Sequence, residues 1–195
     1  MNFFHLGIKD DVTPYMKGKV KLSNQVSIMC AFIGFFYAFF IYAHYEALVI
    51  YPAMLFVISI SLLALNHFGM VQTSRFLASF QMLIMASLFH ASIIQSSDSF
   101  LIPFFCSMLA MTLIPWVLYG MEEKVMLIIS LTICYGLLLS QGYLNQILEI
   151  PVDVAFFRES YLNIMTYAFA IAIAVVLLIM MKLDDSERYK LKEVE

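Results

Sequence analysis

The stretch from residue 47 to residue 65, ALVIYPAMLFVISISLLAL, decides the fold of this chain. It has 19 residues and no charged side chain. A helix needs about 20 predominantly apolar residues to cross the hydrocarbon core of a bilayer, which is about 30 Å thick. This stretch is therefore long enough to span a membrane as one helix.

Five further stretches have the same character, and short polar turns separate them. The six predicted spans are residues 22–42, 47–65, 75–94, 100–118, 125–140 and 161–181. The chain is 63% hydrophobic and 13% charged, whereas soluble domains are about 45–50% apolar and about 25% charged. We therefore expect an all-α membrane protein, a six-transmembrane-helix bundle over residues 22–181. Residues 1–21 are expected to be a cytoplasmic lead-in, and residues 182–195 the start of a helical stalk.

The basic residues indicate the orientation of this bundle. Ten of the 11 Lys and Arg residues fall on one side of the membrane when the six spans are threaded through it. They are Lys9, Lys17, Lys19, Lys21, Arg75, Lys124, Lys182, Arg188, Lys190 and Lys192, with Arg158 alone opposite. Basic residues close to the ends of spans stay in the cytoplasm during insertion. Both termini are therefore expected in the cytoplasm. There is no basic patch beyond this pattern, which speaks against nucleic-acid binding.

The interior of the predicted spans gives no sign of coupled transport. No Asp, Glu, Lys or Arg lies in the middle of a span, although ion-coupled transporters usually keep such groups there. Helices broken by Gly or Pro, which mark many transporter sites, are lacking apart from Pro115. We expect Pro115 to kink or end the fourth span.

Catalytic and metal-binding motifs are also lacking. Neither G-x-S-x-G nor H-E-x-x-H occurs. Glu122 and Glu123 are interpreted as part of a cytoplasmic turn, and the three cysteines, Cys30, Cys106 and Cys134, as small apolar side chains. We therefore expect no catalytic residue, resident metal or cofactor in this chain.

Polar side chains gather at the predicted outer ends of the spans, and they form the candidate ligand-binding site. They are His44, Glu46, Ser87, His90, Gln95 and Asp98. A straight helix carries His90 about 22 Å from the cytoplasmic edge at Arg75, on the same helical face as Ser87. Histidine with carboxylate suits zinc or copper, and histidine can also sense pH. The alternative requires no ligand: His44 is a solvated turn residue, and His90 forms a hydrogen bond to a neighbouring helix.

Aromatic side chains crowd the outer half of the first span, at Phe35, Phe36, Phe39, Phe40 and Tyr42. An apolar ligand could fit among these rings. Packing against other helices and contact with lipid explain them equally well.

The segment after the sixth span has no Gly or Pro to stop the helix at the membrane surface. Asp184 and Arg188 are spaced as a favourable i,i+4 ion pair. The candidate signal-transmission residues in this stalk are Lys182, Asp184, Arg188, Leu191 and Val194.

The layout as a whole resembles a known class of membrane module. Leu6-Gly7-Ile8 and the basic entry KGKVKLSNQ at residues 17–25 open six compact spans, and a charged helical stalk follows. This resembles the N-terminal six-span modules of bacterial signalling proteins, especially those of the Bacteroidetes. Such modules are joined to histidine kinases, class III nucleotide cyclases or metal-dependent serine/threonine phosphatases.

The resemblance implies a sensory and dimerising module in the bacterial inner membrane, which is not itself an enzyme. Its expected partners are the lipid bilayer, a second copy in a homodimer, a small-molecule ligand, and a cytoplasmic effector that is joined or separate. The alternatives are a small transporter or channel for an uncharged solute, and a passive membrane anchor.

Overall fold

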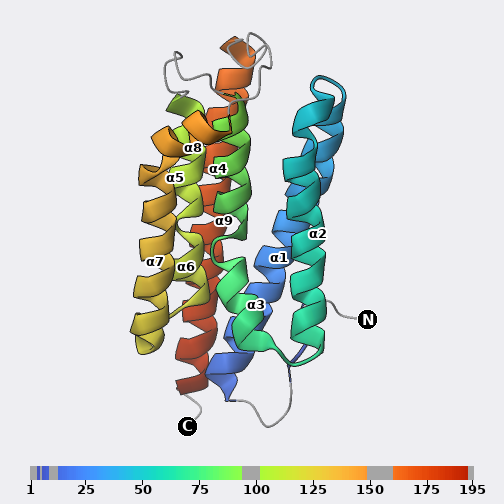
Figure 1. Cartoon of the computed structure of the whole chain (residues 1–195). Coiled ribbons are helices and arrows are strands. Elements are labelled where there is room, and N and C mark those ends of the chain that lie inside the picture. The colour runs from blue at the N-terminus through green and yellow to red at the C-terminus, as the bar shows by residue number, and fades with distance from the viewer. Residues whose placement is uncertain (1–3, 5, 9–12, 94–101, 149–159, 193–195) are drawn as a thin grey trace.

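The computed structural model describes residues 4, 6–8, 13–93, 102–148 and 160–192 (Figure 1). These residues are almost entirely helical and contain no strand. The long helices are α1 (Pro14–Tyr42), α2 (Ile50–His67), α4 (Gln81–Ile93), α7 (Lys124–Leu139) and α9 (Ser160–Lys192). The shorter elements are η2 (Glu46–Leu48), α3 (Val71–Ala78), α5 (Ile102–Met111), α6 (Ile114–Leu118), η3 (Met121–Glu123) and α8 (Gln141–Ile147).

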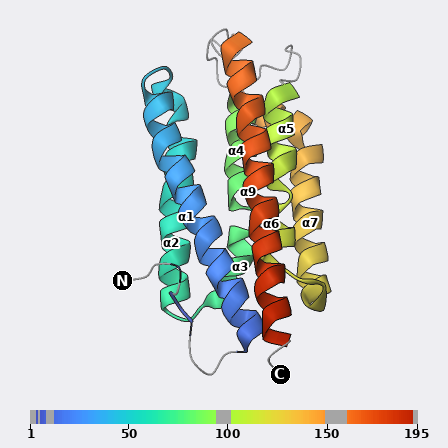
Figure 2. The ribbon, with the colours of Figure 1, turned by 180° about the vertical axis from the view of Figure 1, so that it is seen from behind.

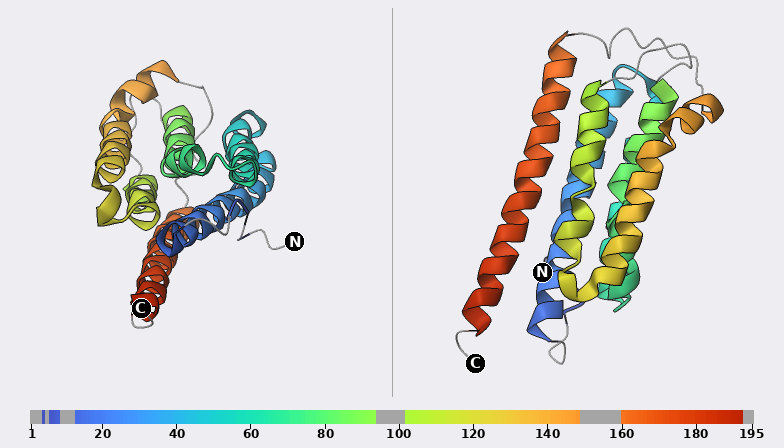
Figure 3. Two further views of the ribbon diagram at one scale, coloured as in Figure 1. Left: turned by 90° about the horizontal axis from the view of Figure 1, so that it is seen from below. Right: turned by 90° about the vertical axis from the view of Figure 1, so that its left-hand side faces the viewer.

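The helices run roughly along one common direction, in two groups. The α1–α2 hairpin stands apart from α4, α5, α7 and α9 in the upper half of Figure 1. The groups converge at the other end, where α1 begins and α9 ends (Figure 2). The view along the bundle shows α1 and α9 side by side at this end (Figure 3). We call the end of the bundle where α1 begins and α9 ends the terminal end. The opposite end, which contains η2, is called the η2 end.

Four helices among the described residues are long and apolar enough to cross a membrane: Pro14–Tyr42, Glu46–His67, Val71–Ile93 and Ile164–Asp184. Ile102–Leu118 and Met121–Leu139 meet the same criterion only as a pair, which is bent by 95° at its break. Counted as one span, this pair raises the number to five. The chain is therefore an all-helical protein suited to crossing a membrane several times.

The outer surface of these helices agrees with this conclusion. Large apolar side chains are exposed along α1, α2, α7 and α9, including Phe39, Val57, Ile128, Leu139 and Ile171. Water-soluble proteins rarely expose contiguous apolar patches of this kind. This surface is suited to contact with lipid.

The first helix begins at Pro14, eight residues before the predicted start of the span. Proline fits the first turn of a helix, where no backbone N–H is needed. The Oγ1 of Thr13 accepts a hydrogen bond from the Met16 N–H at 3.4 Å, which caps the helix. The predicted lead-in is thus partly helical.

Two helices are interrupted, one of them close to Pro115 as the sequence predicts. The α5–α6 segment is interrupted at Thr112 and Leu113, and Pro115 follows in the first turn of α6. Proline cannot donate the hydrogen bond that a continuous helix requires. A second break, at Ser79 and Phe80, separates α3 from α4 without any Gly or Pro. There the Ser79 hydroxyl donates to the carbonyl of Phe76 at 2.6 Å, which competes with regular helical bonding.

The closest approach of α1 and α2 lies at Gly34. A Cβ atom there would stand 2.7 Å from the Phe56 nitrogen and 2.8 Å from the Pro52 oxygen. Both are backbone atoms, so neither helix can yield by rotating a side chain.

We expect Gly34→Ala to separate the α1–α2 hairpin and to lower the free energy of unfolding by about 1–3 kcal/mol, as overpacking usually does. Gly136→Ala is the matched control, because no described atom lies within 4 Å of the corresponding Cβ position in α7. In this variant the free energy of unfolding should rise by up to about 1 kcal/mol, because alanine has a higher helix propensity than glycine. Thermal unfolding in detergent measures both, and equal effects of the two variants would contradict the close approach.

Candidate functional site

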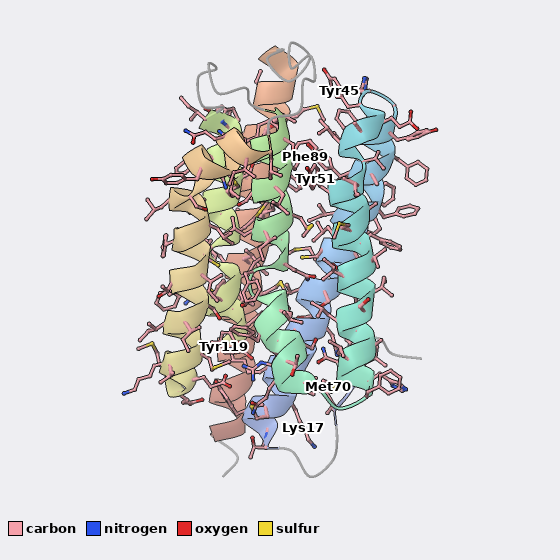
Figure 4. All side chains as sticks on the ribbon, in the orientation of Figure 1. Lys17, Tyr45, Tyr51, Met70, Phe89 and Tyr119 are labelled. Atoms are coloured by element: carbon pink, nitrogen blue, oxygen red, sulfur yellow. The ribbon has the colours of Figure 1, made fainter. Side chains whose placement is uncertain are left out.

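An apolar cavity of about 430 Å³ lies between the α1–α2 hairpin and helices α4, α5 and α9. Ligand pockets in proteins usually measure about 300–1,000 Å³. Figure 4 shows Tyr51 of α2 and Phe89 of α4 directed toward each other from the two sides of this space. Their rings stand edge to face with centroids 6.3 Å apart.

One wall of the cavity is aromatic and comes from α1. It contains Phe32, Phe36, Tyr37 and Phe40, whose spacing of three and four residues places them on one side of the helix. The rings of Phe32 and Phe36 lie 4.5 Å apart, and Tyr37 contacts Phe89 with ring centroids 5.5 Å apart. The aromatic stripe noted in the sequence thus contributes to the cavity in part, through Phe36 and Phe40.

The facing wall is rich in methionine. Its five methionines are Met82, Met85, Met108, Met111 and Met165, from α4, α5 and α9. The pairs in α4 and α5 are each separated by three residues, so each pair projects from one helical face. Methionine is flexible and polarisable, which lets such a wall adapt to ligands of different shape.

Two of the hydroxyl groups at the cavity, those of Tyr51 and Ser107, bond to the protein itself. The Tyr51 hydroxyl and the Ser92 Oγ lie 2.5 Å apart and share a hydrogen bond. The Ser107 hydroxyl lies within hydrogen-bond distance of the carbonyls of Pro103 (3.1 Å) and Thr166 (3.3 Å). The second of these contacts joins α5 to α9 beside the cavity.

The predicted polar ligand site does not gather around one point. His44 and Glu46 are exposed near η2, whereas His90 is fully buried and its Nδ1 lies 3.3 Å from the Gln141 Oε1 of α8. The buried Ser87 hydroxyl lies 3.7 Å from the Met108 sulfur. Gln95 and Asp98 lie outside the described residues. No three His, Cys, Asp or Glu residues in the described part of the chain are placed to hold a metal ion.

A buried ion pair at the terminal end joins the first helix to the last. The Lys19 Nζ lies 3.1 Å from Asp184 Oδ2, and the two side chains are only 4% and 8% exposed. Lys19 also donates to the Val117 carbonyl of α6 at 3.0 Å. A Cβ at Gly18 would stand 3.1 Å from Asp184 Oδ1, so α1 and α9 approach closely here.

A second ion pair joins α3 to η3. Arg75 donates to both carboxylate oxygens of Glu123, at 3.0 and 2.6 Å, and to the Leu118 carbonyl at 2.7 Å. Its guanidinium carbon also lies 4.9 Å from the centre of the Tyr119 ring. The Tyr15 hydroxyl of α1 donates to Glu123 at 2.9 Å. The bidentate geometry makes this a strong and directional contact.

These contacts give two charged residues a role that the sequence did not predict. Arg75 was expected at the first position of the third span, but α3 begins earlier, at Val71, and Arg75 is 1% exposed. Glu123 was interpreted as part of a cytoplasmic turn; it lies in the short η3 between α6 and α7, and it is also the partner of Arg75.

The stalk residues differ in their surroundings. Asp184 forms an ion pair with Lys19 of α1. The i,i+4 pair of Asp184 with Arg188 stays a prediction. Lys182 is exposed. The side chains of Arg188 and Leu191, and all of Val194, lie outside what the structure describes.

The segment after α7 begins with the helix α8, in which Gln141 and Asn145 are buried. Gln141 meets His90 because α8 packs against α4. Apart from the amide of Gln141, no feature of the sequence predicts this contact.

Comparison with other proteins adds no relative. No known protein family matches the chain, and neither a curated protein nor a solved structure shows significant similarity to it.

Proposed function

We propose that this protein is a membrane receptor module whose last helix transmits occupancy of the apolar cavity to a cytoplasmic effector. The observation that carries the proposal concerns α9. Its residues Met165, Thr166 and Phe169 line the cavity, and the same helix continues without interruption to Lys192 at the terminal end.

The geometry of α9 supports transmission over a long distance. Met165 and Asp184 are 19 residues apart, which corresponds to about 28 Å along a helix. A ligand that packs differently against two positions of α9 favours one of them, and a rigid helix carries that difference to its far end. The Lys19–Asp184 ion pair would hold α9 in one of these positions.

The orientation in the proposal follows from the distribution of charge. All six Lys and Arg side chains that the structure describes belong to the terminal end: Lys17, Lys19, Lys21, Arg75, Lys124 and Lys182. This favours a cytoplasmic location for that end, with six passes in the inner membrane of a bacterium. The resemblance to bacterial signalling modules supports a homodimer formed through the stalk.

Cysteine labelling tests the orientation. We expect a cysteine at Ala43 to react with a membrane-impermeant maleimide in intact spheroplasts, and a cysteine at Lys182 to react only after permeabilisation. Both positions are exposed, and Cys30, Cys106 and Cys134 are replaced by alanine in the background chain. Labelling of both positions from the same side would contradict the proposed topology.

Insertions in α9 test the transmission itself. The complete chain is joined to a cytoplasmic reporter enzyme whose activity depends on dimer geometry, and one to four alanines are inserted between Asp185 and Ser186. Each residue turns the following helix by about 100°, so reporter activity should rise and fall with insertion length. The same activity at every length would overturn transmission through α9 and favour a passive anchor.

A transporter for an uncharged solute is the second candidate, because two helices of the bundle are interrupted. Discontinuous helices often form substrate sites in transporters. Here the polar groups at the α3–α4 break contact other helices: Ser79 meets Ser130 at 3.2 Å, and Ser59 donates to Gln81 at 3.3 Å. Saturable uptake of an uncharged solute into proteoliposomes would favour this candidate over the receptor.

A further inference from the structure

We propose that the cavity binds an uncharged, lipid-soluble molecule with one long hydrocarbon part, which enters sideways from the bilayer between α1 and α9. This inference rests on the proposed receptor function and names its class of ligand. It follows from three features: the described lining has no charged side chain, the opening lies between α1 and α9, and the walls consist of aromatic rings and methionines.

The absence of charged side chains in the described cavity wall excludes an ionic ligand. None of the 19 described residues that line it is charged. The hydroxyls of Tyr51 and Ser107 already have partners, in Ser92 and in the carbonyls of Pro103 and Thr166. An ionised group placed among these side chains would lose its hydration without gaining a counter-charge. The ligand is therefore neutral, and its polar part is small.

The opening of the cavity is identified by lining residues that also reach the surface. On α1 these are Phe32 and Phe36, which are 65% and 54% exposed, and on α9 Met165 is 59% exposed. The opening thus lies between α1 and α9, the two helices in front in Figure 2. Both belong to segments apolar enough to cross a membrane, so it faces hydrocarbon and not water.

A buried apolar cluster lies at the η2 end of the cavity. Ile41, Leu48, Phe89 and Ile93 form a buried cluster there, in which the most exposed side chain is only 4% accessible. A ligand from the aqueous phase would have to part this cluster. A ligand dissolved in the bilayer reaches the opening between α1 and α9 directly.

The walls favour an extended hydrocarbon. Flat rings from α1 face flexible methionines from α4, α5 and α9, and this combination suits a chain that can adopt several conformations. A volume of about 430 Å³ accommodates one such chain, but not the two chains and head group of a phospholipid.

Photolabelling of the complete chain tests the proposal. The protein is reconstituted in phosphatidylcholine vesicles with a long-chain primary alcohol that carries a diazirine, and the labelled residues are mapped by mass spectrometry. We expect labelling on the lining residues of α1, α4, α5 and α9, and competition by an excess of the unlabelled alcohol. The matched long-chain sulfonic acid, which stays ionised in the bilayer at neutral pH, should label these residues at least about tenfold less, which corresponds to about 1.4 kcal/mol.

Replacing either of two alanines by phenylalanine distinguishes binding in the cavity from binding at the outer surface. Ala86→Phe places a ring inside the cavity, because Ala86 lines it, and should lower the labelling about tenfold. Ala168→Phe, on an exposed part of α9 that does not line the cavity, is the matched control and should label normally. If Ala86→Phe does not fold, Ala86→Leu fills less of the same space and should give a smaller loss.

Several outcomes would overturn the inference. Labelling that is not competed, or that spreads evenly over all lipid-facing positions, would show that bilayer lipid merely fills a groove. Equal labelling by the acid would show that the ligand need not be neutral. None of these results alters the insertion test in α9, so failure of the ligand class and failure of the receptor function are distinguishable.

Discussion

Replacing Glu123 by glutamine should lower the free energy of unfolding by about 3 kcal/mol. Removal of one partner from a buried ion pair typically costs about 3–5 kcal/mol, because the other charge remains buried without compensation. The side chain of Arg75 is 1% exposed, so water cannot replace the lost carboxylate, while Glu123 is 22% exposed. This partial exposure places the expected effect at the lower end of the range.

The neighbouring residue supplies the control. Glu122 precedes Glu123 in η3, carries the same charge and is exposed. Glu122→Gln should therefore change stability by less than about 0.5 kcal/mol, as most surface substitutions do. Thermal and denaturant unfolding in detergent compare the two variants. Equal stability of Glu123→Gln and Glu122→Gln would mean that the Arg75 contact contributes nothing to the fold.

The sequence was sufficient to predict the helices, because hydrophobic length determines them. The α2 segment, the α5–α6 segment and α7 end within a few residues of the predicted spans. The break near Pro115 was also predictable, since proline acts locally through its missing N–H. The break at Ser79 was not, because most serines in apolar helices bond to a preceding carbonyl without interrupting the helix.

The partners of the charged residues could not be predicted. Lys19 and Asp184 are 165 residues apart in the chain, and Arg75 and Glu123 are 48 apart. Their basic members were interpreted only as markers of topology, a role that requires no partner. A basic residue at the end of a span can satisfy the topology rule and an ion pair at once, and only the packing of the helices distinguishes the two situations.

The cavity was visible in the sequence only in part. The aromatic spacing in the first span was apparent, but lipid-facing rings have the same pattern as cavity-lining ones. Phe36 lines the cavity and Phe39 does not, although both are exposed on the same helix. The methionine wall combines three helices whose relative rotation depends on long-range packing. Its members carry no local signal that brings them together.

Reversing the charge of Lys19 should release the end of α9 from α1. In Lys19→Asp two carboxylates would face each other at a site where the present side chains are 4% and 8% exposed. We expect a loss of about 3–5 kcal/mol in stability and faster hydrogen exchange in the backbone of residues 182–192. Asp184→Lys should behave in the same way, because two ammonium groups would then meet near the Val117 carbonyl.

The double variant Lys19→Asp with Asp184→Lys tests whether the pair itself holds the helices. The double variant restores opposite charges. Its loss of stability should be smaller, by at least about 1 kcal/mol, than the sum of the losses in the two single variants, since contacting residues couple by about 0.5–3 kcal/mol. Recovery should be incomplete, because an aspartate at position 19 cannot donate to the Val117 carbonyl. Lys182→Asp is the control: it makes the same Lys-to-Asp change at an exposed position of α9, and so reports the loss of one basic residue from the terminal end. If the double variant exchanges as fast as the single ones, some contact other than the Lys19–Asp184 pair holds α9 in place.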